Sequence, residues 1–361
     1  MTRVDTITAV TTLHRRIGFE IELLAPDGLD RRRLADDLAG RHGGTVRGIW
    51  HQDFGPSELK TMGGRFLQLS QGFEVRRAGG EPLCTLVDDI SLLHDLTPET
   101  PPVKGWYRLV TDDFRLSCLL ADRCDPEAAI DQVLEPPAAM WRASVRRHDD
   151  VTGRGNDVYE FADRTGNTIA LASPYGGGRE RACEIVTPPL AADHTERLEE
   201  LLAPARELGF SVPFDGSVHL HVDGAPFRRP HALANVIRLF AHWRDPLRTL
   251  LATNPASNRL APLPEPLVAA AEGEPSYERI QQAAEQITLS KFFDVNVRQL
   301  LKPHPERDTL EIRILPSTTS AEEIAARAAT VESLLARCEQ PTPIPLPPPN
   351  PAEALDRLRS L

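Results

Sequence analysis

The sequence is poor in cysteine, lacks long apolar runs and carries no recognisable leader. Its five cysteines are widely spaced and form no C-x-x-C pair, which argues against a zinc ribbon or a dithiol redox motif and fits reduced thiols. No stretch approaches the roughly 18 apolar residues of a membrane span. Residues 1–10 lack the basic segment and apolar core of a secretory signal. We therefore expect a cytoplasmic protein without a membrane partner.

The common nucleotide-binding motifs are also missing. No G-x-G-x-x-G opens a helix, and the glycine-rich run at 174–179 lacks the Lys-Ser/Thr pair of a P-loop. We interpret that run as a mobile loop that covers a functional site. The formal charge of −11 and the pI of about 5.5 argue against a nucleic acid as the main partner. An acidic composition by itself identifies no substrate.

The pattern of apolar residues predicts an α+β protein. Strands are expected at 15–24, within 45–76, and at 106–111, 159–161, 168–172 and 181–187; helices are expected at 30–42, 193–208, 230–253 and 321–338. Pro246 is expected to bend or split the third of these helices. The strands are two-faced and lack regular βαβ spacing, which favours a mostly antiparallel sheet backed by helices.

The expected domain organisation has one main domain between two short ends. Residues 1–14 form an N-terminal lead, and 15–340 form the main domain, with an insertion suggested at about 114–180; residues 125–157 within it show only faint periodicity. Residues 341–361 combine a proline-rich linker with a short C-terminal helix. With 41% hydrophobic residues, a chain of 361 residues can build such a core.

Three predicted strands each carry two ionisable side chains one residue apart. The pairs are Glu20 with Glu22, His219 with His221, and Glu311 with Arg313. Side chains two residues apart in a strand share a face, so each pair projects together. Glu184 is a further carboxylate within an apolar strand. Because a buried charge without a partner is costly, these groups indicate a site for a cation and an anion such as phosphate.

Each pair also has a simpler interpretation. A Glu-x-Glu strand is most often a solvated face, buried histidines are often structural, and Glu311 with Arg313 alone is typical of a surface ion pair. Their co-occurrence favours function. Two further hypotheses stay open: a zinc hydrolase that uses His219, His221 and a glutamate, and a non-catalytic nucleotide-binding module. Cys183, beside Glu184, is expected to be a buried structural thiol.

Five short motifs in order resemble the putative amidoligase family, which is related to glutamine synthetase and glutamate-cysteine ligase. The motifs are Glu-Ile-Glu at 20–22, Cys-Glu-Ile-Val-Thr-Pro-Pro-Leu at 183–190, His-Leu-His-Val at 219–222, Val-Asn at 295–296 and Glu-Ile-Arg-Ile-Leu-Pro-Ser-Thr at 311–318. The resemblance covers about residues 15 to 340. The chain departs from the family pattern at Ser217, where a glycine is usual.

The resemblance implies a glutamine-synthetase-like fold, with a curved antiparallel sheet that holds ATP and Mg²⁺ or Mn²⁺. The implied metal ligands are Glu20, Glu22, Glu184, His219 and Glu311. The implied phosphate or nucleotide contacts are His221, Arg313 and Asn296, with Arg313 and Glu311 also assigned to catalysis. The implied reaction joins a carboxylate and an amine, on small molecules or peptides, through an acyl phosphate. The choice between a monomer and a homo-oligomer is left open.

Overall fold

A computed structural model describes every residue except 1–11, 53–56, 59–64, 90–91, 93, 98, 150–156, 258–259, 288 and 303–306. Most of the expected N-terminal lead therefore lies outside the described residues. The chain forms two compact units. Unit 1 comprises Met1–Ile21, Thr187–Ala203 and Phe214–Leu361, and unit 2 comprises Glu22–Val186 and Pro204–Pro213. The division falls within strand β1 (Ile17–Leu24) and helix α4 (His194–Glu207).

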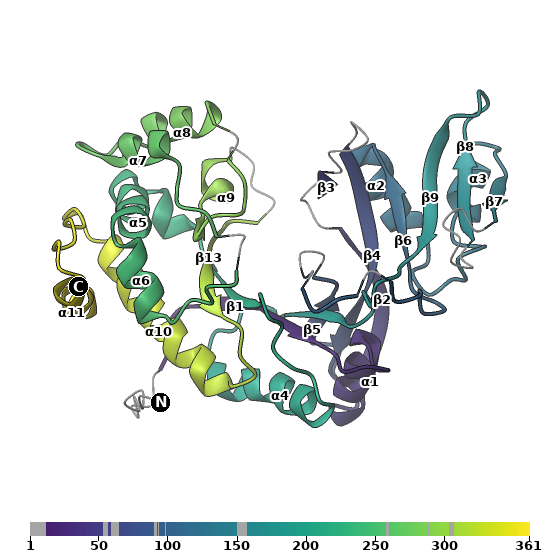
Figure 1. Ribbon diagram of the computed structural model, residues 1–361, viewed down its shortest axis with the longest axis horizontal. Helices are drawn as coiled ribbons and strands as arrows, with labels where there is room; N and C mark the ends of the chain where they lie inside the picture. The colour runs from purple at the N-terminus through teal and green to yellow at the C-terminus, as the bar shows by residue number, and fades with distance from the viewer. Residues whose placement is uncertain are drawn as a thin grey trace. The chain divides into compact units, whose positions relative to one another are not determined.

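Unit 1 combines a short run of strands with most of the helices (Figure 1). Its strands lie in the order β12–β13–β11–β1. Besides β1 they are β11 (Ser217–Asp223), β12 (Val295–Asn296) and β13 (Thr309–Pro316). The helices are η1 (Ala225–Arg228), α5 (Pro230–His242), α6 (Arg244–Leu250), α7 (Glu265–Ala271), α8 (Tyr277–Glu285), α9 (Arg298–Leu301), α10 (Ala321–Cys338) and α11 (Pro351–Arg359).

Unit 2 contains the longer run of strands, in the order β10–β5–β4–β6–β9–β8–β7, and the end of β1 lies beside β10. These strands are β4 (Arg65–Arg76), β5 (Pro82–Val87), β6 (Tyr107–Thr111), β7 (Val145–His148), β8 (Val158–Ala162), β9 (Thr168–Pro174) and β10 (Ala182–Val186). Two more strands, β2 (Thr45–Gln52) and β3 (Ser57–Glu58), pair with β4. The helices are α1 (Arg31–Arg41), α2 (Phe114–Arg123) and α3 (Glu135–Met140).

This architecture confirms the predicted α+β class and the mostly antiparallel sheet. Every pair of strands whose register the described residues define is antiparallel. The segment 114–180, which the sequence left unassigned in part, contains helices α2 and α3 and strands β7 to β9. The specific glutamine-synthetase-like form stays a prediction.

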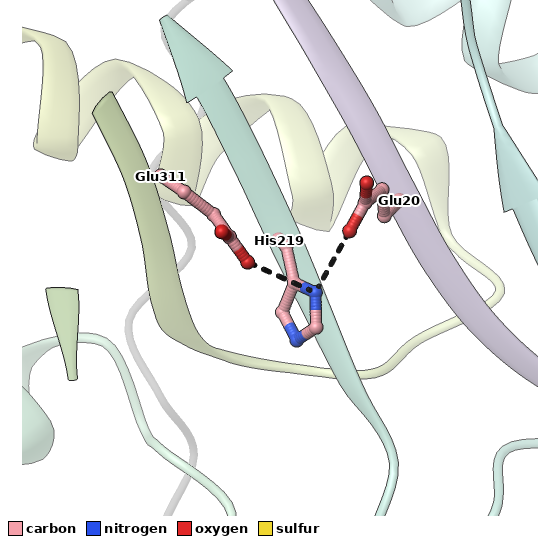
Figure 2. Close-up of side chains that lie close together, drawn as sticks. All are labelled: Glu20, His219 and Glu311. Carbon is pink, nitrogen blue, oxygen red and sulfur yellow. Dashed lines mark hydrogen bonds and ion pairs between the residues drawn. The ribbon is translucent and has the colours of Figure 1, made fainter. Parts of the chain in front are cut away.

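The sheet of unit 1 has one apolar face. In β11, Val218, Leu220 and Val222 alternate with the polar side chains and are almost fully buried. Helix α10 packs against α5, and both contribute buried apolar residues such as Leu233 and Leu335. The close-up in Figure 2 shows a helix behind the strands, while the polar side chains project from the opposite face. The core therefore supports the strands from behind and leaves the polar face for other contacts.

The glycine-rich loop at 174–179 is anchored within unit 2. The hydroxyl of Tyr175 donates to Asp88, and the guanidinium of Arg179 lies 2.7 Å from the same buried carboxylate. Arg179 also donates to the backbone carbonyls of Asp89 and Leu92. Buried polar contacts of this kind hold the two flanks of the glycine run in place, and the mobility of the loop stays a prediction.

The proline-rich segment after α10 is hydrogen-bonded to the body of unit 1. The side-chain amide of Asn235 donates to the backbone carbonyls of Cys338, Gln340 and Thr342, and its oxygen accepts from the amide of Ile344. Trp243 donates from Nε1 to the carbonyl of Pro345 over 2.7 Å.

No helix among the described residues is long and apolar enough to cross a membrane.

Candidate active site

Strand pairing brings the first two sequence motifs together. Strands β1 and β11 are antiparallel, with Glu20 directly opposite His219 and Gly18 opposite His221. Directly opposed residues in a sheet project from the same face, so the carboxylate meets the imidazole although 199 positions separate them. Gly18 adds no side chain beside His221, which leaves this part of the polar face open.

The third motif joins the same face through β13. Glu311 lies opposite His221 on β11 and opposite Asn296 on β12. The β11–β13 pairing shifts register between Val218 and Leu220, where β13 accommodates one extra residue in a bulge. Arg313 lies next to this irregularity and contacts Glu311. The sheet therefore gathers residues from all the motifs that lie in unit 1.

Three of the gathered side chains form a compact group of oxygen and nitrogen donors (Figure 2). Nδ1 of His219 lies 3.2 Å from Oε2 of Glu20 and 3.8 Å from Oε1 of Glu311. One ligand atom from each residue lies within 4.8 Å of the others. Their side chains are 5–14% exposed. The group is thus close enough to share one cation and is almost closed to water.

The protonation states suit a cation. Burial alone would raise the pKa of the Glu20 carboxyl, but the charge of His221 and the hydrogen bonds of His219 and His221 outweigh it and hold that pKa well below its usual value. Burial, aided by the Arg313 guanidinium, lowers the pKa of His219. Near neutral pH the site therefore offers a charged carboxylate and a neutral imidazole, the forms that bind metals.

Glu311 is held by two neighbours. The Nδ2 amide of Asn296 donates to Oε2 over 2.7 Å, and Arg313 forms a close ion pair with Oε1. Burial alone would raise the pKa of Glu311, but the Arg313 charge outweighs it, so this pKa is lowered. Asn296 also accepts a hydrogen bond from the amide of Arg298 at the start of α9. These contacts give Asn296 a positioning role beside its predicted place in a nucleotide pocket.

His221 and Arg307 both lie beside the outer oxygen of Glu20. Nε2 of His221 is 3.1 Å from Oε1, and a guanidinium nitrogen of Arg307 is 3.5 Å from the same oxygen. Burial would lower the pKa of His221, but the Glu20 charge outweighs it and raises that pKa. The sequence analysis missed Arg307, because the residue precedes the strand and belongs to no motif.

Glu22 and Glu184 belong to unit 2 and are not part of this group. The amide of Ala25 donates to the carbonyl of Arg181, and counting back along the two antiparallel strands places Glu22 opposite Glu184. The two carboxylates thus neighbour each other on β1 and β10. Their roles as metal ligands stay predictions.

Cys183, beside Glu184, is fully buried, and burial raises the pKa of its thiol, as expected for a structural cysteine.

The donor set of the group distinguishes between metals. Carboxylate oxygens with a single imidazole are compatible with Mg²⁺ or Mn²⁺, whereas hydrolytic zinc sites commonly use two or three imidazoles. The group formed by the described residues contains one imidazole, from His219. Arg313 next to it has the planar, permanently charged fork that suits a phosphate. The residues present therefore fit a divalent cation together with a phosphorylated ligand.

Taken together, the fold and the group define an α+β protein with an almost buried ionisable site on one face of a sheet. The chain belongs to the family described as putative amidoligase enzyme, whose model matches residues 13–335. No curated protein matches the chain. The family match confirms the resemblance carried by the motifs and indicates an enzyme of the ligase type.

Proposed function

We propose that this chain is an ATP-dependent carboxylate–amine ligase that acts through an acyl phosphate. The observation that carries the proposal is the convergence of Glu20, His219 and Glu311 from three strands, with Arg313 in contact with Glu311. A zinc hydrolase needs the carboxylates and imidazole alone, whereas a protein that binds a metal complex of ATP also needs a cationic side chain for the phosphates. Among proteins that use ATP, the family match favours a ligase.

In this proposal the three grouped residues hold Mg²⁺ or Mn²⁺, and Glu22 and Glu184 of unit 2 are further candidate ligands. The cation would neutralise part of the negative charge on the ATP phosphates. Arg313 is nearly buried, so its charge acts in a medium of low dielectric constant, where it stabilises a transferring phosphoryl group more strongly than in water. His221, with its raised pKa, is suited to donate to a phosphate oxygen.

The proposed chemistry has two steps. An oxygen of the substrate carboxylate attacks the γ-phosphorus of ATP, and the bond to the bridging oxygen breaks to release ADP. An amine then attacks the carbonyl carbon of the acyl phosphate, and inorganic phosphate leaves as the amide forms. The substrates are a small molecule or a peptide that carries the acid, and a second that carries the amine.

One observation favours a second candidate, a metal-dependent hydrolase. His221 lies 3.1 Å from Glu20, which is also bonded to His219, so a rotated His221 could bring a second imidazole to a zinc ion. The two proposals differ in the metal that is retained. Protein purified without added metal would carry zinc at one ion per chain in the hydrolase and would lack it in the ligase.

The direct test is calorimetric titration of the chain with Mn²⁺ and then with Mn-ATP. We expect Glu20→Gln and Glu311→Gln to weaken Mn²⁺ binding at least tenfold, because each removes a charged ligand oxygen. Glu322→Gln is the matched control, since Glu322 is an exposed carboxylate on α10 and should leave binding unchanged. Wild-type protein that binds neither Mn²⁺ nor Mn-ATP would refute the proposal.

A further inference from the structure

Ser217 occupies the position next to His219 on the polar face of β11. The two residues are two apart in the strand, so their side chains project from the same face. The Ser217 hydroxyl oxygen lies 2.8 Å from Nε2 of His219, and both residues are buried. Nδ1, the other ring nitrogen, faces Glu20 and Glu311. Each nitrogen of this imidazole therefore has its own polar neighbour.

The position of the proton on the His219 imidazole determines whether Ser217 and Glu20 donate or accept a hydrogen bond. A neutral imidazole carries one N–H donor and one acceptor nitrogen. Glu20 and Glu311 are ionised and can only accept, so in the metal-free protein the proton belongs on Nδ1, where it is donated to Glu20 over 3.2 Å. Nε2 is then the acceptor, and the Ser217 hydroxyl donates to it.

A cation bound at Nδ1 reverses these roles. Nδ1 must then offer its lone pair, so the single ring proton lies on Nε2 and the imidazole stays neutral. Ser217 must now accept that proton in a hydrogen bond. A hydroxyl can donate or accept by rotating about its C–O bond, whereas a carboxylate can only accept and an ammonium can only donate.

We propose that Ser217 is a positioning residue of the candidate metal site, whose hydroxyl keeps Nδ1 of His219 turned to the carboxylates both with and without a cation. The inference rests on the proposed function, because it assumes that a divalent cation binds beside His219. It assigns a role to the residue at which this chain departs from the glycine of the family pattern. A glycine or alanine here would leave Nε2 without this partner.

The first test compares Mn²⁺ affinity, measured by calorimetry, in the wild type and three variants. We expect Ser217→Ala to weaken Mn²⁺ binding about 10- to 100-fold, the usual effect of losing the outer partner of a metal-bound histidine. Ser217→Thr retains a hydroxyl and should recover most of the affinity. Ser70→Ala is the matched control, because it removes a buried strand hydroxyl in unit 2 and should leave affinity unchanged.

The second test needs no metal. Nitrogen-15 NMR of the histidine rings, assigned with His219→Gln, should show Nδ1 protonated and Nε2 unprotonated in the metal-free wild type. Ser217→Ala should shift His219 toward a mixture in which Nε2 carries the proton. If the Ser217 hydroxyl only fills space, its removal in Ser217→Ala would lower the melting temperature without changing the ring nitrogen signals of His219.

The outcomes separate this inference from the proposed function. Wild-type protein that binds Mn²⁺, together with an alanine variant of equal affinity and unchanged ring signals, would overturn the role of Ser217 alone. Wild-type protein that binds no Mn²⁺ would overturn both. If the alanine variant does not fold, the wild-type spectrum decides, because a proton on Nε2 without metal contradicts the assignment.

Discussion

At the scale of single residues, Glu20 has three ionisable neighbours in the candidate site. Its two oxygens face His219 at 3.2 Å, His221 at 3.1 Å and Arg307 at 3.5 Å. His219 is buried and the His221 side chain is 15% exposed, while the Arg307 side chain is 60% exposed. Because an exposed charge can move into solvent at small cost, Arg307 is the neighbour that an incoming ligand can displace or recruit.

Replacing Arg307 by alanine should change cation and nucleotide binding in opposite directions. Loss of a positive charge beside Glu20 should tighten Mn²⁺ binding by up to about fivefold, since exposed ion pairs are worth at most about 1 kcal/mol. Loss of a guanidinium should weaken ATP binding, because such groups bind phosphates. Calorimetry of Arg307→Ala checks both, with Arg327→Ala on α10 as the control. A change of the same sign in both affinities would contradict this role.

The sequence predicted the members of the site better than their contacts. The two-residue period of a strand is enough to place His219 beside His221, and the same period would have found Ser217. The period does not reveal that His219 faces Glu20, because that contact depends on a strand pairing across most of the chain. Arg307 precedes its strand, where no period applies, so no signal in the sequence indicated it.

At the scale of elements, local signals predicted the helices with good caps. Asp30 accepts from the amide of Arg33 at the start of α1, and Ser320 accepts from the amide of Glu323 at the start of α10, which are the side-chain types that favour a helix N-terminus. The predicted split near Pro246 is also confirmed, but the break comes earlier, at Trp243. Pro246 lies in the first turn of α6, where a missing amide hydrogen costs little.

Asn235 on α5 links that helix to the proline-rich segment and is expected to contribute to stability. Its amide serves three backbone carbonyls and one backbone amide of the proline-rich segment, and its side chain is almost fully buried. Asn235→Ala removes these buried hydrogen bonds, so we expect a loss of about 1–3 kcal/mol in the free energy of unfolding. Denaturant unfolding measures this loss.

The control for Asn235 is an exposed helical residue, Glu322→Ala, for which we expect a change within about 0.5 kcal/mol. Equal stability of Asn235→Ala and the wild type would mean that the hydrogen bonds of Asn235 contribute nothing to the stability of unit 1. Truncation after Gln340 should lower stability, because it removes Ile344 and the carbonyl partner of Trp243.

At the scale of the whole molecule, the candidate ligands divide between the two units. Glu20, His219, Glu311 and Arg313 lie in unit 1, whereas Glu22 and Glu184 lie in unit 2. A ligand that binds only the native state stabilises the part of the protein that holds it. Local stability, measured separately in each unit, can therefore report which carboxylates bind the cation.

Hydrogen-exchange mass spectrometry with and without Mg²⁺ should locate the stabilisation. At a cation concentration 100 times the dissociation constant, binding adds about 2.7 kcal/mol to the free energy of opening the part that holds the cation. Amide hydrogen exchange that requires this opening then slows about 100-fold. We expect this slowing in β11 and β13, and none in β6 and β9. Slowing in β10 as well would indicate that Glu184 and its neighbour Glu22 also bind cations. Glu311→Gln should reduce the slowing in unit 1 at the same cation concentration, because it weakens binding at least tenfold, and undiminished slowing in this variant would show that the cation binds elsewhere.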